Sequence, residues 1–366
     1  MLFGGKNPAT VKNWRILNFY RKQAAKNNIQ GKRKHEEDLV DSSTGLLISG
    51  RAKFHNRVIR IRRSLRQMTV FNDRPRRSLL YIPGNNPGMI QNCAIYGSDG
   101  VLLDLEDSIS IYEKDAARKL VKHALKTLDF GSVEMVVRVN GPDTPFFHDD
   151  LEEIVPARPD AVRIPKINSP DDVKMADEKI SRLEEKYSIE PGSVRIHAML
   201  ETAGAIVMAP AIAASSPRII GLTIGGQDLA ADMGIKITPG GLELLYARSA
   251  VVLAAKAYGL LAFDTVYTDI DNLEGLREQA ELSVALGFSG KAAIHPSQIA
   301  VIHEAFAPDE KEVARAERIV RGAREAGKKG LGVVAVDGRM VDAPVVAQAE
   351  RTLELARLAG MEVGIS

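Results

Sequence analysis

Eight short apolar runs, each followed by a longer segment of helical periodicity, organise the chain after residue 76. The runs are rich in Val, Ile and Leu, as expected of parallel strands that are buried on both faces. They are Ser78–Ile82, Gly100–Leu105, Glu134–Val139, Ala161–Pro165, Arg195–Leu200, Ile219–Ile224, Leu260–Phe263 and Gly290–Ile294. Eight strands separated by helices predict an α/β fold, a (β/α)8 TIM barrel.

Helices are predicted between these strands at Lys114–Thr127, Pro170–Lys186, Gly241–Tyr258 and Leu273–Leu286. A doubly wound open sheet is the alternative fold. That fold would place a glycine-rich fingerprint after its first strand. Residues 84–88 read Gly-Asn-Asn-Pro-Gly, which is typical of a turn, so the barrel is favoured.

The C-terminal part of the chain exceeds what a barrel requires. A charged helix is predicted at about Pro308–Ala326 and a final helix at about Val345–Ala359. Between them, Asp337-Gly338 is a strong hairpin signal. We therefore expect a catalytic barrel at residues 76–306 and an appended helical arm at residues 307–366.

The N-terminal part carries a different charge from the rest. Residues 1–70 hold 16 Lys+Arg and 4 Asp+Glu, a net charge of +12, whereas the remainder holds 33 and 43, a net charge of −10. We expect residues 1–75 to be a basic, disordered extension, or the translation upstream of a start at Met68. A targeting peptide and a nucleic-acid-binding arm are the less favoured alternatives.

Composition limits where the protein works. The hydrophobic fraction of 45% and the charged fraction of 26% are typical of a soluble globular protein. No apolar run approaches the roughly 18 residues that a membrane helix needs. Cys93 is the sole cysteine, so an internal disulfide is excluded. A cytoplasmic protein without a membrane partner is expected.

Polar side chains cluster at the predicted strand ends, where the reactive groups of a TIM barrel lie. Carboxylates from several strands that converge with an arginine indicate a divalent cation and an anionic substrate. The side chains at these ends are Asp104, Glu106, Asp107, Arg138, Lys166, Glu201, Gln227, Asp228 and His295.

Glu201 and Asp228 are the predicted metal ligands. Magnesium takes one or two protein carboxylates and keeps waters or substrate oxygens in its other positions. The glycines before Asp228 let the backbone at Gly226 and Gln227 approach an oxyanion and donate N–H groups. The alternative is helix capping, with Asp228 as an N-cap and Glu201 in the first turn of a helix at Ala203–Ala213.

Arg138 is predicted to bind a substrate carboxylate through two parallel hydrogen bonds. Its alternative role is a structural ion pair with Asp104 or Glu106. Lys166 is given an electrostatic role, because the metal pair disfavours a Schiff base there. For His295, structural and catalytic roles stay open.

Taken together, these segments resemble the citrate lyase β-subunit group of the HpcH/HpaI aldolase superfamily. The resemblance covers about residues 75–360. The matching segments are Arg76–Gly84, Leu103–Ser108, Val136–Asn140, Arg163–Lys166, Glu201–Gly204 and Gly338–Pro344.

The resemblance implies a homotrimer of barrels. It implies that Mg²⁺ is bound by Glu201 and Asp228, and that Arg138 holds a substrate carboxylate. It further implies that Asp342, in the arm, reaches a neighbouring subunit's site and acts as an acid/base.

The implied reaction is a retro-Claisen cleavage of a citryl thioester into oxaloacetate and an acetyl thioester, by an oxo-acid lyase. Glu106 and Asp107 would complete the catalytic set by ordering waters around the metal or orienting Arg138. A malyl-CoA or methylmalyl-CoA lyase or synthase of the same superfamily is the alternative. A non-catalytic assembly subunit is less favoured.

The thioester carrier is left open. Residues Ile294–Gln298 resemble a stand-alone branch that uses free coenzyme A. Tyr246–Ser249 and Leu331–Val334 resemble the complex-bound subunit, whose carrier is the phosphopantetheine-type acyl-carrier (γ) subunit and whose other partner is the α subunit.

Overall fold

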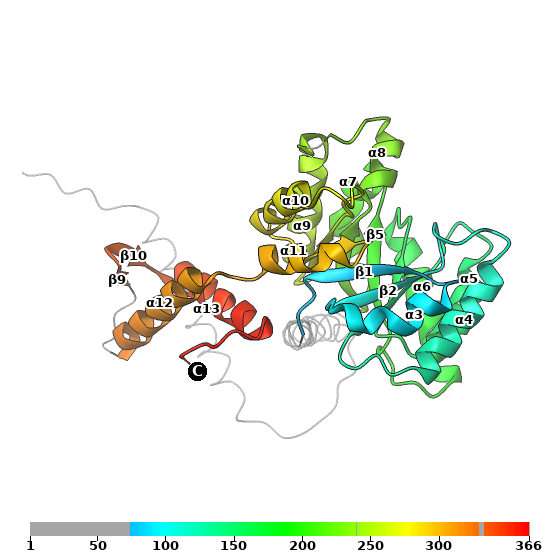
Figure 1. Ribbon diagram of the computed structural model, residues 1–366, viewed down its shortest axis with the longest axis horizontal. Coiled ribbons are helices and arrows are strands. Elements are labelled where there is room, and N and C mark those ends of the chain that lie inside the picture. Colours follow the sequence, from blue (N-terminus) through cyan, green and yellow to red (C-terminus); the bar gives the residue numbers. More distant parts are fainter. Residues whose placement is uncertain (1–73, 239, 329–332, 366) are drawn as a thin grey trace, which may run out of the picture. The chain divides into compact units, whose positions relative to one another are not determined.

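The computed structural model describes residues 74–238, 240–328 and 333–365. Within them, eight parallel strands close into a barrel, with β1 paired to both β2 and β8 (Figure 1). The strands are β1 Ser78–Pro83, β2 Gly100–Asp104, β3 Glu134–Arg138, β4 Ala161–Ile164, β5 Arg195–Leu200, β6 Ile219–Ile224, β7 Leu261–Asp264 and β8 Gly290–Ala293. The predicted TIM barrel is confirmed, and each strand end lies within one residue of its predicted position.

Helices follow the strands and surround the barrel (Figure 1). Three predicted helices have their predicted bounds, whereas Gly241–Tyr258 divides into a short 3-10 turn and α9. The helical elements are α3 Pro87–Asn92, η1 Cys93–Tyr96, α4 Lys114–Thr127, α5 Phe147–Ile154, η2 Val155–Ala157, α6 Pro170–Lys186, α7 Ala203–Ala213, α8 Gly226–Met233, η3 Leu242–Leu244, α9 Leu245–Ala257, α10 Leu273–Leu286 and α11 Ser297–Phe306.

Local sequence explains where these helices begin. Ser169 caps α6 in a capping box with Asp172, and Pro170 occupies the first helical position. Thr202 caps α7 through its hydroxyl, which accepts the N–H of Ala205. Glu201 therefore precedes the cap of α7, which removes its alternative role in that helix's first turn.

The core has two layers. A large apolar cluster fills the space between the strands and the surrounding helices. A smaller one fills the barrel interior, with fully buried side chains such as Leu79, Leu102 and Phe263. Each fully buried Leu or Phe contributes about 1.5–3 kcal/mol to folding. Among the described residues, this interior cluster fills the barrel with apolar side chains.

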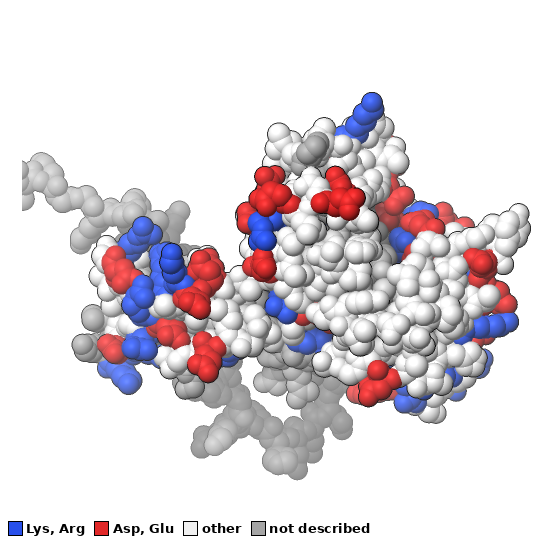
Figure 2. Space-filling model, viewed as in Figure 1, with Lys and Arg blue, Asp and Glu red and all other residues white. Residues whose placement is uncertain are grey.

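The arm has a hydrophobic cluster of its own, built from α12 Glu310–Lys328, β9 Val334–Val336, β10 Arg339–Val341 and α13 Ala343–Leu358. The antiparallel pairing of β9 and β10 confirms the predicted hairpin. Asp337 and Gly338 both have positive φ angles, 51° and 72°, as a type I′ turn requires. Acidic and basic side chains are mixed over its visible face (Figure 2).

Other expectations fare differently. Residues 1–73 lie outside the described residues, so the predicted extension and its boundary at residue 75 stay predictions. The boundary between barrel and arm at residue 306 is likewise a prediction. Among the described helices, none is long and apolar enough to cross a membrane. Cys93 is a buried free thiol, and burial raises its pKa to about 11.

Candidate active site

A cavity of about 430 Å³ opens at the carboxyl ends of the barrel strands. Its lining includes six of the residues predicted from the strand ends or the loops that follow them: Asp104, Asp107, Arg138, Gly226, Gln227 and Asp228. Glu106, Lys166 and Glu201 adjoin the lining through the ion pairs and hydrogen bonds described below. The structure therefore brings together most of the predicted site.

Arg138 lies at the centre of a carboxylate cluster. Its Nε and Nη2 donate to the two oxygens of Asp104 at 2.6 and 2.7 Å. Its Nη1 is 2.8 Å from Glu106 and donates to Asp107 at 3.2 Å. The structural ion pair considered as an alternative for Arg138 is thus present, although the guanidinium also faces the cavity.

Asp104 organises the loop that follows β2. Its carboxylate also accepts the N–H groups of Glu106 and Ser108, at 2.9 and 3.1 Å. Burial is the largest single influence and would raise the pKa of Asp104, but the hydrogen bonds and charge of Arg138, with the hydrogen bonds from Ser108 and Glu106, together lower it. From the other side, Lys114 Nζ donates to the carbonyls of Leu105 and Glu106. The loop is fixed from both sides.

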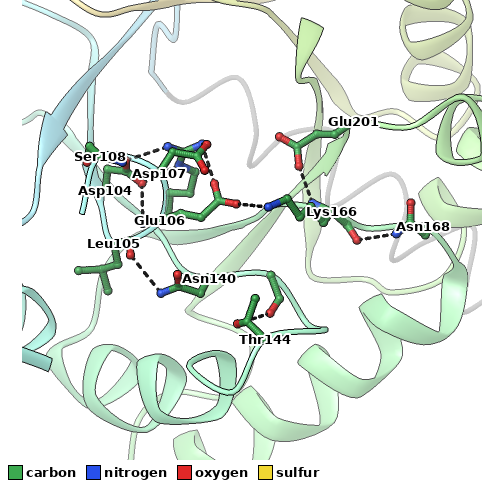
Figure 3. A network of polar contacts seen from close by, with 12 residues as sticks. Asp104, Leu105, Glu106, Asp107, Ser108, Asn140, Thr144, Lys166, Asn168 and Glu201 are labelled. Atoms are coloured by element: carbon green, nitrogen blue, oxygen red, sulfur yellow. Dashed lines mark hydrogen bonds and ion pairs between the residues drawn. The ribbon is translucent and has the colours of Figure 1, made fainter. Parts of the chain in front are cut away.

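Glu106 is buried, and its carboxylate is ion-paired to Arg138 and to Lys166. The Nζ of Lys166 lies 3.1 Å from its Oε1 (Figure 3). The two carboxylate oxygens are thus ion-paired, one to each cation. Burial dominates and raises the pKa of Glu106 to about 7. This carboxyl group can therefore hold or release a proton near neutral pH.

Glu201 follows β5 and is also buried. Its Oε2 accepts the N–H of Lys166 at 2.7 Å, but its Oε1 has no hydrogen-bond partner among the described residues (Figure 3). Burial, followed by the charges of Glu106 and Asp228, raises the pKa of Glu201 to about 8. A buried carboxylate oxygen without a partner, near a second carboxylate, is stabilised either by a proton or by a bound cation.

Two glycines make room for these groups. A Cβ at Gly225 would lie 2.5 Å from Cγ of Glu201, and one at Gly226 would lie 2.9 Å from Oγ1 of Thr265. The N–H groups of both glycines are engaged, since Gly225 donates to Leu200 O and Gly226 to Thr265 Oγ1. The expected oxyanion contact from Gly226 is therefore not free.

The start of α8 offers two further donors. Gln227 and Asp228 lie in its first turn, are exposed and line the cavity. Among the described residues, their N–H groups have no hydrogen-bond acceptor. The N-cap of α8 is Gly225, so the capping role considered for Asp228 is wrong.

The donor set fits magnesium. Within the described residues, no group of three or more His, Cys, Asp or Glu side chains is arranged to hold a metal ion. A closed zinc site is excluded for that part of the chain. A buried carboxylate with one unpaired oxygen, together with Asp228 in the cavity lining, suits Mg²⁺, whose other ligands are waters and substrate oxygens. Glu201 and Asp228 would hold it.

Two predicted side chains lie elsewhere. His295 is exposed and outside the cavity lining, and its ring is bonded to Ser297. Asp342 is the N-cap of α13, accepts the N–H of Val345 at 3.3 Å, and lines a smaller cavity of about 270 Å³ within the arm. Its reach into a neighbouring subunit's site stays a prediction.

Sequence reasoning missed several cavity residues, among them Tyr81, Met199 and Asp264. The ring of Tyr81 lies under Arg138, with the guanidinium carbon 5.1 Å from its centroid, and its hydroxyl accepts a hydrogen bond from buried Arg163 at 3.1 Å. Tyr81 and Met199 sit inside predicted apolar runs, which carried no sign of a polar role.

Comparison with known proteins agrees with this geometry. The sequence model of the HpcH/HpaI aldolase/citrate lyase family matches residues 77–296. The chain belongs to this family. It is 43% identical to citrate lyase subunit beta of Haemophilus influenzae over 282 residues, which cover 77% of this chain and 97% of that protein.

Two other relatives span a similar range. L-malyl-CoA/beta-methylmalyl-CoA lyase of Cereibacter sphaeroides is 35% identical over 306 residues, covering 78% of this chain and 96% of that protein. The crystal structure of CitE from Mycobacterium tuberculosis in complex with magnesium, acetoacetate and coenzyme A matches with a TM-score of 0.65. Its identity is 33%, and the match covers 79% of this chain and 99% of that one.

Proposed function

We propose that this family member is a Mg²⁺-dependent carbon–carbon lyase that cleaves a citryl thioester into oxaloacetate and an acetyl thioester. The observation that carries the proposal is the unpaired, buried Oε1 of Glu201, whose carboxylate interacts electrostatically with Asp228 in the cavity lining. The similarity to citrate lyase subunit beta and to a CitE structure with magnesium and coenzyme A supports the substrate and the metal.

The reaction moves one proton and breaks one bond. A base takes the proton of the tertiary hydroxyl, and the bond from that carbon to the carbon next to the thioester breaks. The electron pair goes to the thioester enolate, and a proton delivered to its carbon gives the acetyl group. Bound Mg²⁺ would polarise the hydroxyl and keto oxygens and lower the pKa of the alcohol.

The chain's own groups hold and orient the substrate. The positive charge of Arg138 can bind a substrate carboxylate. That carboxylate would take the place of the exposed Asp107 as a hydrogen-bond partner of Arg138. The free N–H groups of Gln227 and Asp228 can donate to an enolate or keto oxygen. Glu106 orients Arg138 and can hold a proton near neutral pH.

The acid/base role goes to Asp342 of a neighbouring subunit in a homotrimer. Helix α7 supports association between copies, because none of its 11 residues is charged and it leaves Val207 77% exposed. In the neighbouring helix α9, Tyr246 is also 79% exposed. Val207→Glu should lower the mass measured by sedimentation equilibrium, and an unchanged mass would show that this face is not the interface.

A substrate comparison tests the function. Purified protein with Mg²⁺ should release oxaloacetate from citryl-CoA, and more slowly or not at all produce glyoxylate from malyl-CoA. His295→Ala serves as the control that retains activity, because its ring lies outside the cavity lining. Rapid glyoxylate release would instead assign the malyl-CoA chemistry that the 35% identical relative suggests.

The carrier is tested by the same assay. We propose cytoplasmic cleavage of a citryl group on either free coenzyme A or the acyl-carrier subunit of a citrate lyase complex that also holds an α subunit. Faster turnover of the citryl-loaded carrier protein than of citryl-CoA would assign the protein to the complex. Nucleic acid and membrane have no part in this proposal.

A further inference from the structure

Lys166 has an uncommon backbone conformation. Its φ angle is +53°, and only three other non-glycine residues in the described part of the chain have positive φ: Arg158, Ser188 and Asp337. For a residue with a Cβ, this conformation costs on the order of 1–2 kcal/mol. Asp337 belongs to a hairpin turn and Ser188 follows α6. Lys166 alone of the four touches the site.

The left-handed turn directs the N–H of Lys166 to Glu201. The donor–acceptor distance to Oε2 is 2.7 Å, the length of a charge-assisted hydrogen bond. One oxygen of Glu201 is thereby fixed, and the other, Oε1, is the buried atom without a hydrogen-bond partner. The backbone of residue 166 thus sets which oxygen of Glu201 remains for a metal ion.

The side chain of Lys166 makes the second contact. Its Nζ is 3.1 Å from Oε1 of Glu106, and its stem passes over Gly141, where a Cβ would lie 3.5 Å from Cβ and Cδ of Lys166. Figure 3 shows Lys166 between Glu106 and Glu201. One residue therefore contacts both buried carboxylates, one through its backbone and the other through its ammonium group.

The segment around Lys166 is held in place. The N–H of Ile167 donates to Met199 O at 3.2 Å, and Asn168 donates to the carbonyl of Lys166 at 3.1 Å. Asn168 also accepts the hydroxyl of Thr202, the residue after Glu201, at 2.7 Å. These bonds tie the loop after β4 to the end of β5 and maintain the left-handed turn.

We propose that Lys166 is a positioning residue: its left-handed backbone orients Glu201 for Mg²⁺, and its ammonium group holds Glu106 beside Arg138. This inference rests on the proposed function in taking Glu201 as a metal ligand. A glycine would adopt the turn without strain but could not hold Glu106. A β-branched residue would resist the turn and misplace the N–H.

Two substitutions separate the backbone from the side chain. Lys166→Gly keeps the turn and loses the ammonium group, whereas Lys166→Val loses the ammonium group and disfavours the turn. Mn²⁺ binding, followed by electron paramagnetic resonance, should be within about threefold of the wild type in Lys166→Gly. It should weaken by about 10–100-fold in Lys166→Val, the usual effect of losing a partner that orients a ligand.

The side-chain contact has its own readout. With whichever thioester the wild type cleaves, Lys166→Met should lower kcat with little change in Mn²⁺ affinity, and Lys166→Arg should restore much of kcat. The matched control is Ser188, which has a φ of 52° and is exposed after α6. Ser188→Gly and Ser188→Val should shift the melting temperature but leave Mn²⁺ affinity unchanged.

Equal Mn²⁺ affinity in Lys166→Gly and Lys166→Val would overturn the backbone role, as would a loss in Lys166→Gly as large as that in Glu201→Gln. If Lys166→Val does not fold, Lys166→Thr, which is also β-branched, takes its place in the comparison with Lys166→Gly. If the wild type and the variants bind Mn²⁺ with the expected order of affinities but the wild type cleaves no thioester, only the proposed function is overturned. A wild type that binds no Mn²⁺ would overturn both.

Discussion

Two charged networks lie at the strand ends of the same barrel, and they differ in completeness. Asp264, at the end of β7, is the centre of the first network. Its carboxylate accepts hydrogen bonds from Arg248, Lys291 and Ser283 at 2.6–3.2 Å. Burial is the largest single influence and would raise the pKa of Asp264, but the charges of Lys291 and Arg248 and the hydrogen bonds from Ser283 and Arg248 together lower it. This network is closed and needs no ligand.

The network around Arg138 is open. It gathers more carboxylates than cations, and the buried Oε1 of Glu201 has no hydrogen-bond partner in the described structure. Burial raises the pKa values of Glu106 and Glu201, to about 7 and about 8. A structural network satisfies its own charges, whereas a site that awaits a cation and a substrate leaves some unsatisfied.

The largest expected effect is on stability, in the closed network. Asp264→Asn would leave Arg248 and Lys291 buried without a counter-charge and should lower the free energy of unfolding by about 3–5 kcal/mol. Urea denaturation measures this. Glu106→Gln, in the open network, is the matched change and should cost far less. Similar losses from both would erase the distinction between the networks.

The next effect is on metal binding, in the open network. Glu201→Gln keeps an acceptor for the Lys166 N–H but removes the charge at Oε1. Affinity for Mg²⁺ should fall by more than the roughly 10–100-fold typical of outer ligand-orienting partners. The metal-free variant should be at least as stable as the wild type. Calorimetric titration with MgCl₂ checks the affinity, and unaltered binding would remove Glu201 from the metal site.

A smaller effect distinguishes the networks by pH. Raised pKa values of Glu201 and Glu106 mean that the unfolded chain releases these protons first, so metal-free stability should fall as pH rises from about 4.5 to about 8. Asp264, with a lowered pKa, has the opposite sign and loses its contribution only in acid. Urea titrations in EDTA should show the decline, and Glu201→Gln should reduce it.

The smallest effect concerns Tyr81, whose ring contacts Arg138 of the open network and whose hydroxyl is bonded to Arg163 in the barrel interior. Tyr81→Phe removes the hydroxyl that accepts the hydrogen bond from Arg163 but keeps the ring under Arg138. Stability should fall by about 1 kcal/mol, the net value of one buried hydrogen bond. Thermal melts measure it. A loss several times larger would mean that Tyr81 belongs to the structural core.

Much of this fold could be predicted, because parallel strands buried on both faces appear as continuous apolar runs. Helix α4 and helix α10 could be placed because their apolar positions repeat with helical periodicity. Helix α8 could not, since Gly226–Met233 is only 8 residues long and begins with a glycine. The 3-10 turn at Leu242–Leu244 was likewise hidden inside a longer helical pattern.

The site was predicted as a set of positions and not as a set of contacts. Arg138 and Glu201 could be placed because strand ends of a barrel converge. The ion pair of Arg138 with Asp104 was predicted only as an alternative to substrate binding, and the structure shows it present. No sequence signal showed that Lys166 adopts a left-handed turn, since lysine has no preference for that conformation. Asp264 was missed because the apolar run before it stops at Phe263.

The substitution Gly225→Ala would add one methyl group beside Glu201 and is expected to inactivate the site. The φ angle of Gly225 is −93°, which any residue can adopt, so alanine would be tolerated by the backbone there. The added methyl would nevertheless claim the space of the Glu201 side chain, 2.5 Å away. Gly225→Ala would thus abolish the reaction without replacing any charged residue or altering the arm. Cells that carry this variant would show which phenotypes depend on the reaction and which depend only on the presence of the protein.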